Sequence, residues 1–204
     1  GNYWVVGIVA ATDDYAQSVS APVSFTINKV EIGIAWGSET SFTYNGTPQA
    51  PTATATGAVN DEVLTLTLEG QATNVGTYTA TVTGIMIGDE AANNYQLPAD
   101  GLTIGFTITQ RAISVTLNEY TVTYNGAAFS GSFTTSGRSY NGQTLFTIEE
   151  GGLCGSDTLE GEFTYPKNAI NAGSYAWGSI AWSNQNYKVI VTNGGEEMFV
   201  IDKA

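Results

Sequence analysis

Apolar and polar side chains alternate with a period of two along much of the chain. The alternation is clearest over residues 32–36, 64–68 and 78–82, where threonine fills many of the polar positions. This period is that of a β-strand with one face in a core and one face in solvent, and the branched Cβ of threonine favours the extended backbone. The pattern therefore predicts strands along most of the sequence.

Asn-Gly pairs at 45–46, 125–126, 141–142 and 193–194 separate these segments and predict tight turns. Helical periodicity is almost missing, and the best candidates are single turns at 58–61 and 89–92. We predict an all-β fold built of small β-sandwich modules of immunoglobulin-like size. A β-grasp-like sheet with one short helix is the alternative.

Short motifs recur in the same order along the chain. Tyr-Asn-Gly occurs at 44–46 and 124–126, and Gly-x-Tyr occurs at 76–78 and 173–175. The period of about 80–95 residues is the length of a small β-domain rather than of a solenoid turn. We predict the C-terminal part of an upstream repeat at 1–29, a complete module at 30–110, and a second complete module at 111–204 with a longer segment at 127–152. The chain is thus expected to be a segment of a longer protein.

Aligned repeats predict which rings and apolar side chains lie in the core. Ile32, Ile34 and Trp36 align with Ile113, Val115 and Leu117, and Trp177 aligns with Ala80. We expect both tryptophans to be buried. The same expectation applies to six recurring tyrosines, whose rings should pack in the core: Tyr44, Tyr78, Tyr95, Tyr124, Tyr175 and Tyr187.

The order of motifs in the second module resembles a known family. Tyr-Asn-Gly is followed by an acidic segment at 155–165, by Asn-Ala-Gly-Ser-Tyr at 171–175, by Asn-Tyr at 186–187 and by a closing strand at 199–203. This succession resembles the MBG domains, tandem repeats of large adhesin-like exported proteins of bacteria. The resemblance implies an extracellular or cell-surface location in a bacterium, with neighbouring repeats of the same chain as partners. The module 30–110 departs from the pattern at 57–64.

Charge and composition narrow the classes of partner. The chain has 19 acidic and 6 basic residues, no histidine and a net charge of −13. Nucleic acids and anionic lipid surfaces are disfavoured, because binding them requires clustered lysine and arginine. No apolar stretch reaches membrane-spanning length, so no membrane insertion is expected in this segment. Cys154 is the single cysteine, which rules out a disulfide within the chain.

The residues do not predict an enzyme. Without histidine there is neither a Ser-His-Asp or Cys-His arrangement nor a zinc site of the usual kind. Adjacent carboxylates at 61–62 and 149–150 would point to opposite faces of a strand rather than across a cleft. No cofactor is expected. Calcium is the one ion worth considering, because oxygen ligands gather near the expected module ends at Asp13, Asp14, Asp89, Glu90, Asn93 and Asn94.

Two functions follow. The first is a non-catalytic structural spacer in an adhesin-like surface or secreted protein, and short junctions between modules favour a stiff one. The alternative is a module that binds a surface glycan or a host protein, because aromatic rings stack on sugar C–H faces and amides bond hydroxyls. The candidate glycan contacts are Tyr140, Asn141, Trp182, Asn184, Asn186 and Tyr187.

Overall fold

The computed structural model describes residues 1–204 and contains strands but no helix. The all-β prediction is confirmed. The chain forms two compact units, each assembled from separate segments. Unit 1 contains Gly1–Ser38, Pro51–Gly70 and Thr79–Ile104. Unit 2 contains Glu39–Ala50, Gln71–Tyr78 and Gly105–Ala204. Three segments of the expected module 30–110, residues 39–50, 71–78 and 105–110, therefore belong to the same compact unit as residues 111–204.

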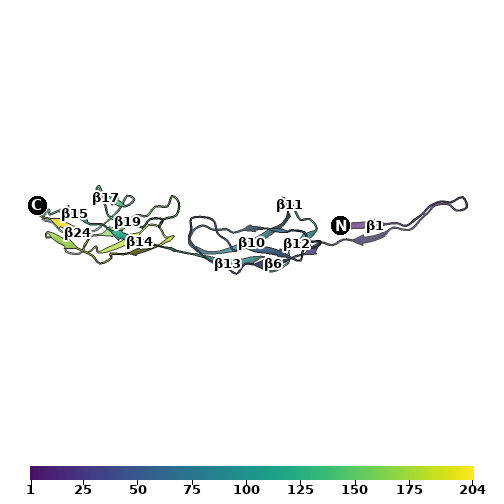
Figure 1. The fold of residues 1–204 in the computed structure, drawn as a ribbon, viewed down its shortest axis with the longest axis horizontal. Coiled ribbons are helices and arrows are strands. Elements are labelled where there is room, and N and C mark those ends of the chain that lie inside the picture. The colour runs from purple at the N-terminus through teal and green to yellow at the C-terminus, as the bar shows by residue number, and fades with distance from the viewer. The chain divides into compact units, whose positions relative to one another are not determined.

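The first 29 residues form two antiparallel strand pairs (Figure 1). The strands are β1 (Asn2–Val5), β2 (Ile8–Val9), β3 (Ser18–Val19) and β4 (Val23–Thr26). β1 pairs with β4, and β2 pairs with β3. Every residue from 1 to 29 is exposed, including Trp4, and the ring of Tyr3 stacks on Phe25 at 5.4 Å. This segment buries no core of its own.

Residues 30–109 contribute nine strands. These are β5 (Val30–Glu31), β6 (Gly33–Trp36), β7 (Ser41–Thr43), β8 (Ala53–Thr56), β9 (Thr65–Glu69), β10 (Gly76–Ile87), β11 (Glu90–Ala91), β12 (Tyr95–Gln96) and β13 (Thr103–Thr109). The largest sheet has the order β11-β10-β13-β7, with β9 also paired to β10. β5 pairs with β12 and β7 with β13 in parallel, whereas β6 and β8 are antiparallel.

The alternating pattern places the core of unit 1 as expected. Ile32, Ile85, Ala92 and Tyr95 form a buried cluster, and the predicted inward face of β9 packs against it through Leu66. On β10, Ala80 and Val82 are buried. Trp36, expected to be buried, is only half-buried, and its indole Nε1–H donates a hydrogen bond to the carbonyl of Gly101 at 2.9 Å.

Neither of the two candidate helical turns forms. At 58–61 the chain makes a turn in which Asn60 and Asp61 have φ values of 54° and 56°, outside the right-handed helical region. At 89–92 the chain leaves β10, turns at Gly88 and Asp89, and returns as β11. The expectation of a helical turn at either place was wrong, and with no helix the β-grasp-like alternative is also excluded.

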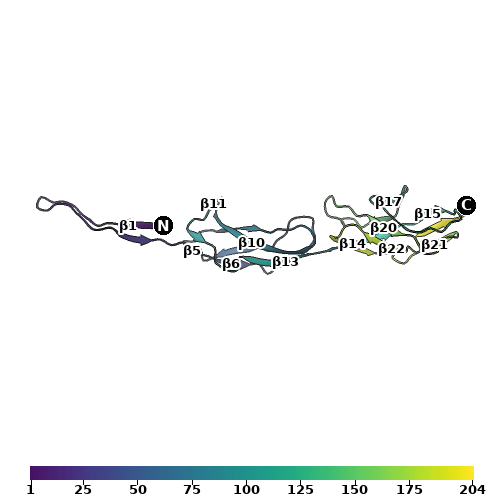
Figure 2. The ribbon, with the colours of Figure 1, turned by 180° about the vertical axis from the view of Figure 1, so that it is seen from behind.

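The remainder of unit 2 is built from four small sheets (Figure 2). Its strands are β14 (Arg111–Leu117), β15 (Tyr120–Thr123), β16 (Ser132–Thr134), β17 (Ser139–Tyr140), β18 (Gln143–Thr144), β19 (Phe146–Ile148), β20 (Gly161–Thr164), β21 (Gly173–Tyr175), β22 (Ser179–Trp182), β23 (Tyr187–Val191) and β24 (Phe199–Asp202). The sheet orders are β19-β14-β23, β15-β24-β21, β16-β20-β22 and β17-β18. β14 runs parallel to β23, and β15 runs parallel to β24.

Aromatic rings fill the core of unit 2. Phe146, Phe163 and Phe199 are fully buried. Trp177 packs against Phe163 and Phe199 with ring centroids 5.0 and 5.2 Å apart, yet it is half-buried rather than enclosed. The predicted inward positions of β14, residues 113, 115 and 117, are all buried.

Candidate functional site

The two Asn-x-Gly-x-Tyr motifs share one hydrogen bond. The hydroxyl of Tyr78 donates to the carbonyl of Asn74 at 2.9 Å, and the hydroxyl of Tyr175 donates to the carbonyl of Asn171 at 2.9 Å. Each ring folds back over its own motif, and a Cβ on Gly76 would lie 2.9 Å from the Tyr78 oxygen. Glycine at 76 thus leaves room for the ring, whereas a Cβ on Gly173 would lie 3.9 Å from the ring of Tyr175. Both half-buried rings pack within unit 2, against Phe106 and Phe199. The motif is part of the scaffold.

A part-buried polar contact in unit 2 joins two tyrosines to one aspartate. The hydroxyls of Tyr44 and Tyr187 donate to the same oxygen, Asp157 Oδ2, at 2.7 and 2.6 Å. The two rings meet edge to face with centroids 5.4 Å apart, and both tyrosines are only 3% exposed. The backbone N–H of Cys154 donates to the Tyr187 hydroxyl at 2.7 Å. We call Tyr44, Asp157 and Tyr187 the tyrosine–aspartate junction.

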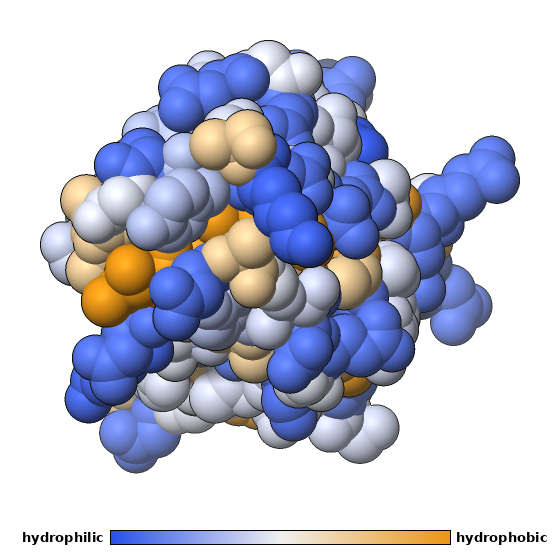
Figure 3. Space-filling view, turned by 90° about the vertical axis from the view of Figure 1, so that its left-hand side faces the viewer, coloured by the Kyte–Doolittle hydropathy of each residue, from blue (hydrophilic) through white to orange (hydrophobic).

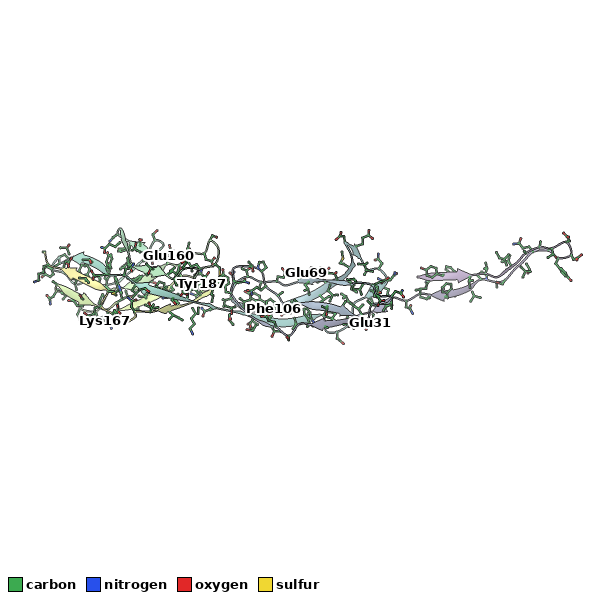
Figure 4. All side chains as sticks on the ribbon, in the orientation of Figure 1. Glu31, Glu69, Phe106, Glu160, Lys167 and Tyr187 are labelled. Carbon is green, nitrogen blue, oxygen red and sulfur yellow. The ribbon has the colours of Figure 1, made fainter.

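Three parts of the chain supply the junction. Tyr44 follows β7, Tyr187 begins β23 (Figure 4), and Asp157 lies in a turn closed by a bond from its N–H to the Cys154 carbonyl at 3.0 Å. Gly46 approaches this turn so closely that a Cβ there would lie 2.9 Å from the Cβ of Cys154. The Tyr-Asn-Gly motif thus provides both the hydroxyl and the space for the contact.

The junction keeps its phenols protonated. Hydrogen bonding to the Asp157 carboxylate, followed by burial, raises the pKa of Tyr44 above its ordinary value. Burial, followed by the bond to Asp157, raises the pKa of Tyr187. Both hydroxyls therefore remain hydrogen-bond donors to Asp157 at neutral pH.

Asparagine side chains extend the same contact region. Asn186 accepts a bond from the N–H of Val75 at 2.9 Å and donates from Nδ2 to Asn74 Oδ1 at 2.9 Å. Gln110, the only residue between β13 and β14, donates from Nε2 to the carbonyl of Gln185 at 3.0 Å. These bonds fix Gln71–Tyr78 and Gln110 to the segment around β23.

A second acidic turn with the same arrangement lies in unit 1. The N–H of Glu62 donates to the carbonyl of Val59 at 3.2 Å, and the N–H of Val59 donates to the hydroxyl of Tyr95 at 3.0 Å. That hydroxyl donates to Glu62 Oε2, which raises the pKa of Tyr95. Val59, Glu62 and Tyr95 therefore correspond to Cys154, Asp157 and Tyr187. The difference is that no second tyrosine bonds Glu62.

The predicted glycan contacts have different surroundings in the structure. Tyr187 and Asn186 are used inside unit 2 by the contacts above. Asn184 bonds the N–H of Asn186 and, from Nδ2, the carbonyl of Thr158. Tyr140 stacks on Phe133 with centroids 3.8 Å apart. Tyr140 and Asn141 line one cavity of about 360 Å³, and Trp182 lines others. As glycan contacts these residues stay a prediction.

A tryptophan-lined cavity of about 280 Å³ lies over β22 and β23. Its walls include Trp177, Trp182 and Glu196. The Nε1–H of Trp177 is buried and has no hydrogen-bond partner. Alignment of the repeats placed Trp177 in the core, so sequence reasoning missed its contribution to this cavity.

The acidic residues do not gather around a metal position. No group of three or more acidic, histidine or cysteine side chains is placed to hold an ion. Asp13 and Asp14 lie in a bend between β2 and β3, and Asp89 lies at the β10–β11 turn. Cys154 is free and half-buried. None of the structure's elements is a helix that could cross a bilayer.

Comparison with protein-family models, curated proteins and solved structures finds no match to this chain. The resemblance to MBG repeats accordingly rests on the sequence motifs alone.

Proposed function

We propose that this chain is a non-catalytic spacer segment of a bacterial cell-surface or secreted adhesin-like protein, in which neighbouring repeats are the main partners. The observation that carries the proposal is the tyrosine–aspartate junction. It ties Tyr44, from the segment expected to belong to module 30–110, to Asp157 and Tyr187 of the segment expected to form module 111–204. A spacer transmits position along a chain of modules, and it does so only when successive modules are fixed to one another.

The strength of the junction supports this role. A hydrogen bond to a charged group contributes about 1.5–3 kcal/mol, and burial excludes the water that would otherwise compete for it. The junction contains two such bonds on one carboxylate. One residue between β13 and β14 leaves little slack in the covalent connection. Both features would oppose bending between the two expected modules.

The surface chemistry supports the same role. The net charge of −13 keeps the chain soluble and disfavours non-specific aggregation. The face of unit 2 at which β15 and β24 end is mostly hydrophilic, with small hydrophobic areas (Figure 3). The motif order that resembles MBG repeats supports an extracellular setting on a bacterial surface.

The proposal is tested by residual dipolar couplings of backbone amides. In the parent chain, the couplings of residues 39–50 and of residues 111–204 should fit one alignment tensor. In Asp157→Ala, which removes the shared acceptor, the two segments should need separate tensors. Asp202→Ala, an exposed acid outside the junction, is the control. Two tensors in the parent chain would overturn the spacer proposal.

Binding of a surface glycan or a host protein is the second candidate. The observation that favours it is the cavity of about 280 Å³, where two indole rings and the Glu196 carboxylate lie together. Rings present apolar faces to sugar C–H groups, and a carboxylate accepts bonds from hydroxyls. A glycan array probed with the parent chain and with Trp182→Ala tests it. Binding by the parent and loss in the variant would identify an adhesin module, and no binding by the parent would remove this candidate.

A further inference from the structure

The loop that contains Tyr124 has the same structure as the loop that contains Tyr44. Tyr44 N–H donates to the carbonyl of Thr109 at 2.9 Å, and Tyr124 N–H donates to the carbonyl of Asp202 at 2.9 Å. In each loop the following asparagine side chain accepts a bond from the N–H two residues later, at 2.9 and 3.0 Å. The glycines that follow have φ values of 78° and 80°. The two loops present their tyrosines on equivalent backbones.

The two tyrosines differ in what they contact. Tyr44 is 3% exposed and its hydroxyl is bonded to Asp157, whereas Tyr124 is 40% exposed and its hydroxyl has no partner. No side chain lies within 4 Å of a Cβ placed on Gly126, although the same position on Gly46 is filled by Cys154. Tyr124 therefore presents an unused copy of the donor half of the junction.

The acidic turn of unit 1 is an unused copy of the acceptor half. Glu62 already accepts a bond from Tyr95, as Asp157 does from Tyr187, but it lacks the bond that Tyr44 gives to Asp157. Val59 is 44% exposed at the position that corresponds to Cys154, the residue that Gly46 packs against. A carboxylate oxygen accepts more than one hydrogen bond, so Glu62 keeps capacity for a second phenol.

We propose that the Tyr124 loop docks on the Val59–Glu62 turn of a second copy of this chain and reproduces the tyrosine–aspartate junction there. The Tyr124 hydroxyl would donate to Glu62 beside Tyr95, and Gly126 would pack against Val59. The proposal rests on the spacer function and extends it, because it states the chemical rule by which one module recognises the next. A neutral phenol donor and an acidic acceptor also suit each other in a chain with so few basic residues.

The contact is heterologous, since the donor and acceptor lie on different surfaces of one chain. Such contacts add copies head to tail and do not close into a symmetric dimer. One isolated contact is small, so the association in solution should be weak and should be captured by a covalent trap.

Disulfide trapping in the full chain tests the proposal. All proteins carry Cys154→Ser to remove the native thiol. One chain carries Gly126→Cys and a second, differently tagged chain carries Val59→Cys, which places the two thiols where Gly46 and Cys154 meet in the existing junction. The matched control replaces Val59→Cys with Ile190→Cys, at a residue of similar exposure.

We expect the mixed disulfide with Val59→Cys to form at least about tenfold faster than that with Ile190→Cys, because docking raises the local thiol concentration. Adding Tyr124→Phe to the Gly126→Cys chain should remove this advantage. Equal rates for Val59→Cys and Ile190→Cys would overturn the proposal. An advantage that survives Tyr124→Phe would also overturn it, because the contact would then not depend on the phenol.

Two checks keep the outcome interpretable. Each variant must melt like the Cys154→Ser protein, and if Gly126→Cys does not, Ala127→Cys in the same exposed loop takes its place. If the mixed disulfide does not form faster with Val59→Cys, the dipolar couplings of the parent chain are not affected by that result. Failure of docking is therefore distinguishable from failure of the spacer function.

Discussion

The hydroxyls of Tyr44 and Tyr187 share a single acceptor, the Oδ2 atom of Asp157. Tyr44 and Asp157 are separated by 113 positions in sequence, so the contact joins distant parts of the chain. In unit 1, Glu62 corresponds to Asp157 but accepts a bond from one tyrosine only. Tyr124 corresponds to Tyr44, but its exposed hydroxyl has no acceptor. The chain therefore contains one complete junction, one unused donor loop and one acidic turn with a free acceptor position. Equivalent residues in the used and unused copies can be mutated and compared within one protein.

The first prediction uses the two equivalent tyrosines. Tyr44→Phe removes a buried bond to a charged group and should lower the free energy of unfolding by about 1–2 kcal/mol. Tyr124→Phe removes an unbonded hydroxyl and should change it by less than about 0.5 kcal/mol. Urea denaturation of both variants measures the difference. Equal losses would show that the Tyr44 hydroxyl does not stabilise the fold.

The second prediction uses the two equivalent glycines. Gly46→Ala and Gly126→Ala carry the same strain of a positive φ, which costs about 1 kcal/mol. Gly46→Ala also pushes a methyl group against Cys154, so it should cost about 1–3 kcal/mol more than Gly126→Ala. Thermal and urea melts compare the two. If both variants lose the same stability, the loop does not pack tightly on the Cys154 turn.

The third prediction concerns alkaline pH. Tyr44, Tyr95 and Tyr187 have raised pKa values, and burial raises the pKa of Tyr165 to about 12. A phenol whose pKa is higher in the folded state favours folding below its unfolded pKa of about 10, and that contribution disappears as pH rises through the folded value. The contribution of these phenols to the free energy of unfolding should therefore be constant below pH 10, and the free energy of unfolding should fall between pH 10 and 12.

Tyr165→Phe provides the control for this pH dependence. Phenylalanine does not ionise, so the fall in stability between pH 10 and about 12 should be shallower than in the parent chain. Urea midpoints at pH 8, 10, 11 and 12 measure the slope. An unchanged slope would mean that Tyr165 ionises as easily in the folded chain as in the unfolded one.

The fourth prediction tests the repeated Asn-x-Gly-x-Tyr geometry. Tyr78→Phe and Tyr175→Phe each remove one bond to a backbone carbonyl and should each lower the free energy of unfolding by about 0.5–1.5 kcal/mol. Tyr15→Phe, at an exposed ring without a bonded hydroxyl, should have almost no effect. Unequal losses at Tyr78 and Tyr175 would show that the two motifs do not play the same structural part.

The sequence predicts the strands and their buried faces well because these depend on local alternation. Ile113, Val115 and Leu117 are buried where period two places them. The helical turn at 58–61 was wrong because Asn60 and Asp61 tolerate positive φ, which composition alone does not signal.

The candidate site was harder to predict because it depends on long-range contacts. Tyr44 and Tyr124 have the same local motif, and the core prediction fails for Tyr124 only because no acidic turn lies beside it. From the sequence, Tyr187 was predicted both as a core residue and as a candidate sugar contact. The structure decides between them, because the Tyr187 hydroxyl is bonded to Asp157 inside unit 2. The spacing of Glu62 from Val59 and of Asp157 from Cys154 is the signal that alignment of the repeats could have revealed.

The parallel ladder between β14 and β23 determines how residues 111–204 would respond to a pulling force. Arg111, where the chain enters β14, pairs with Tyr187, and the register continues to Val115 and Val191. Tension applied through Gln110 and through the end of β24 pulls these strands in opposite directions along their length. The hydrogen bonds of the ladder are then loaded in shear and must break together rather than one at a time. Under such tension, the resistance of the ladder would be set by the rate of forced unfolding rather than by equilibrium stability.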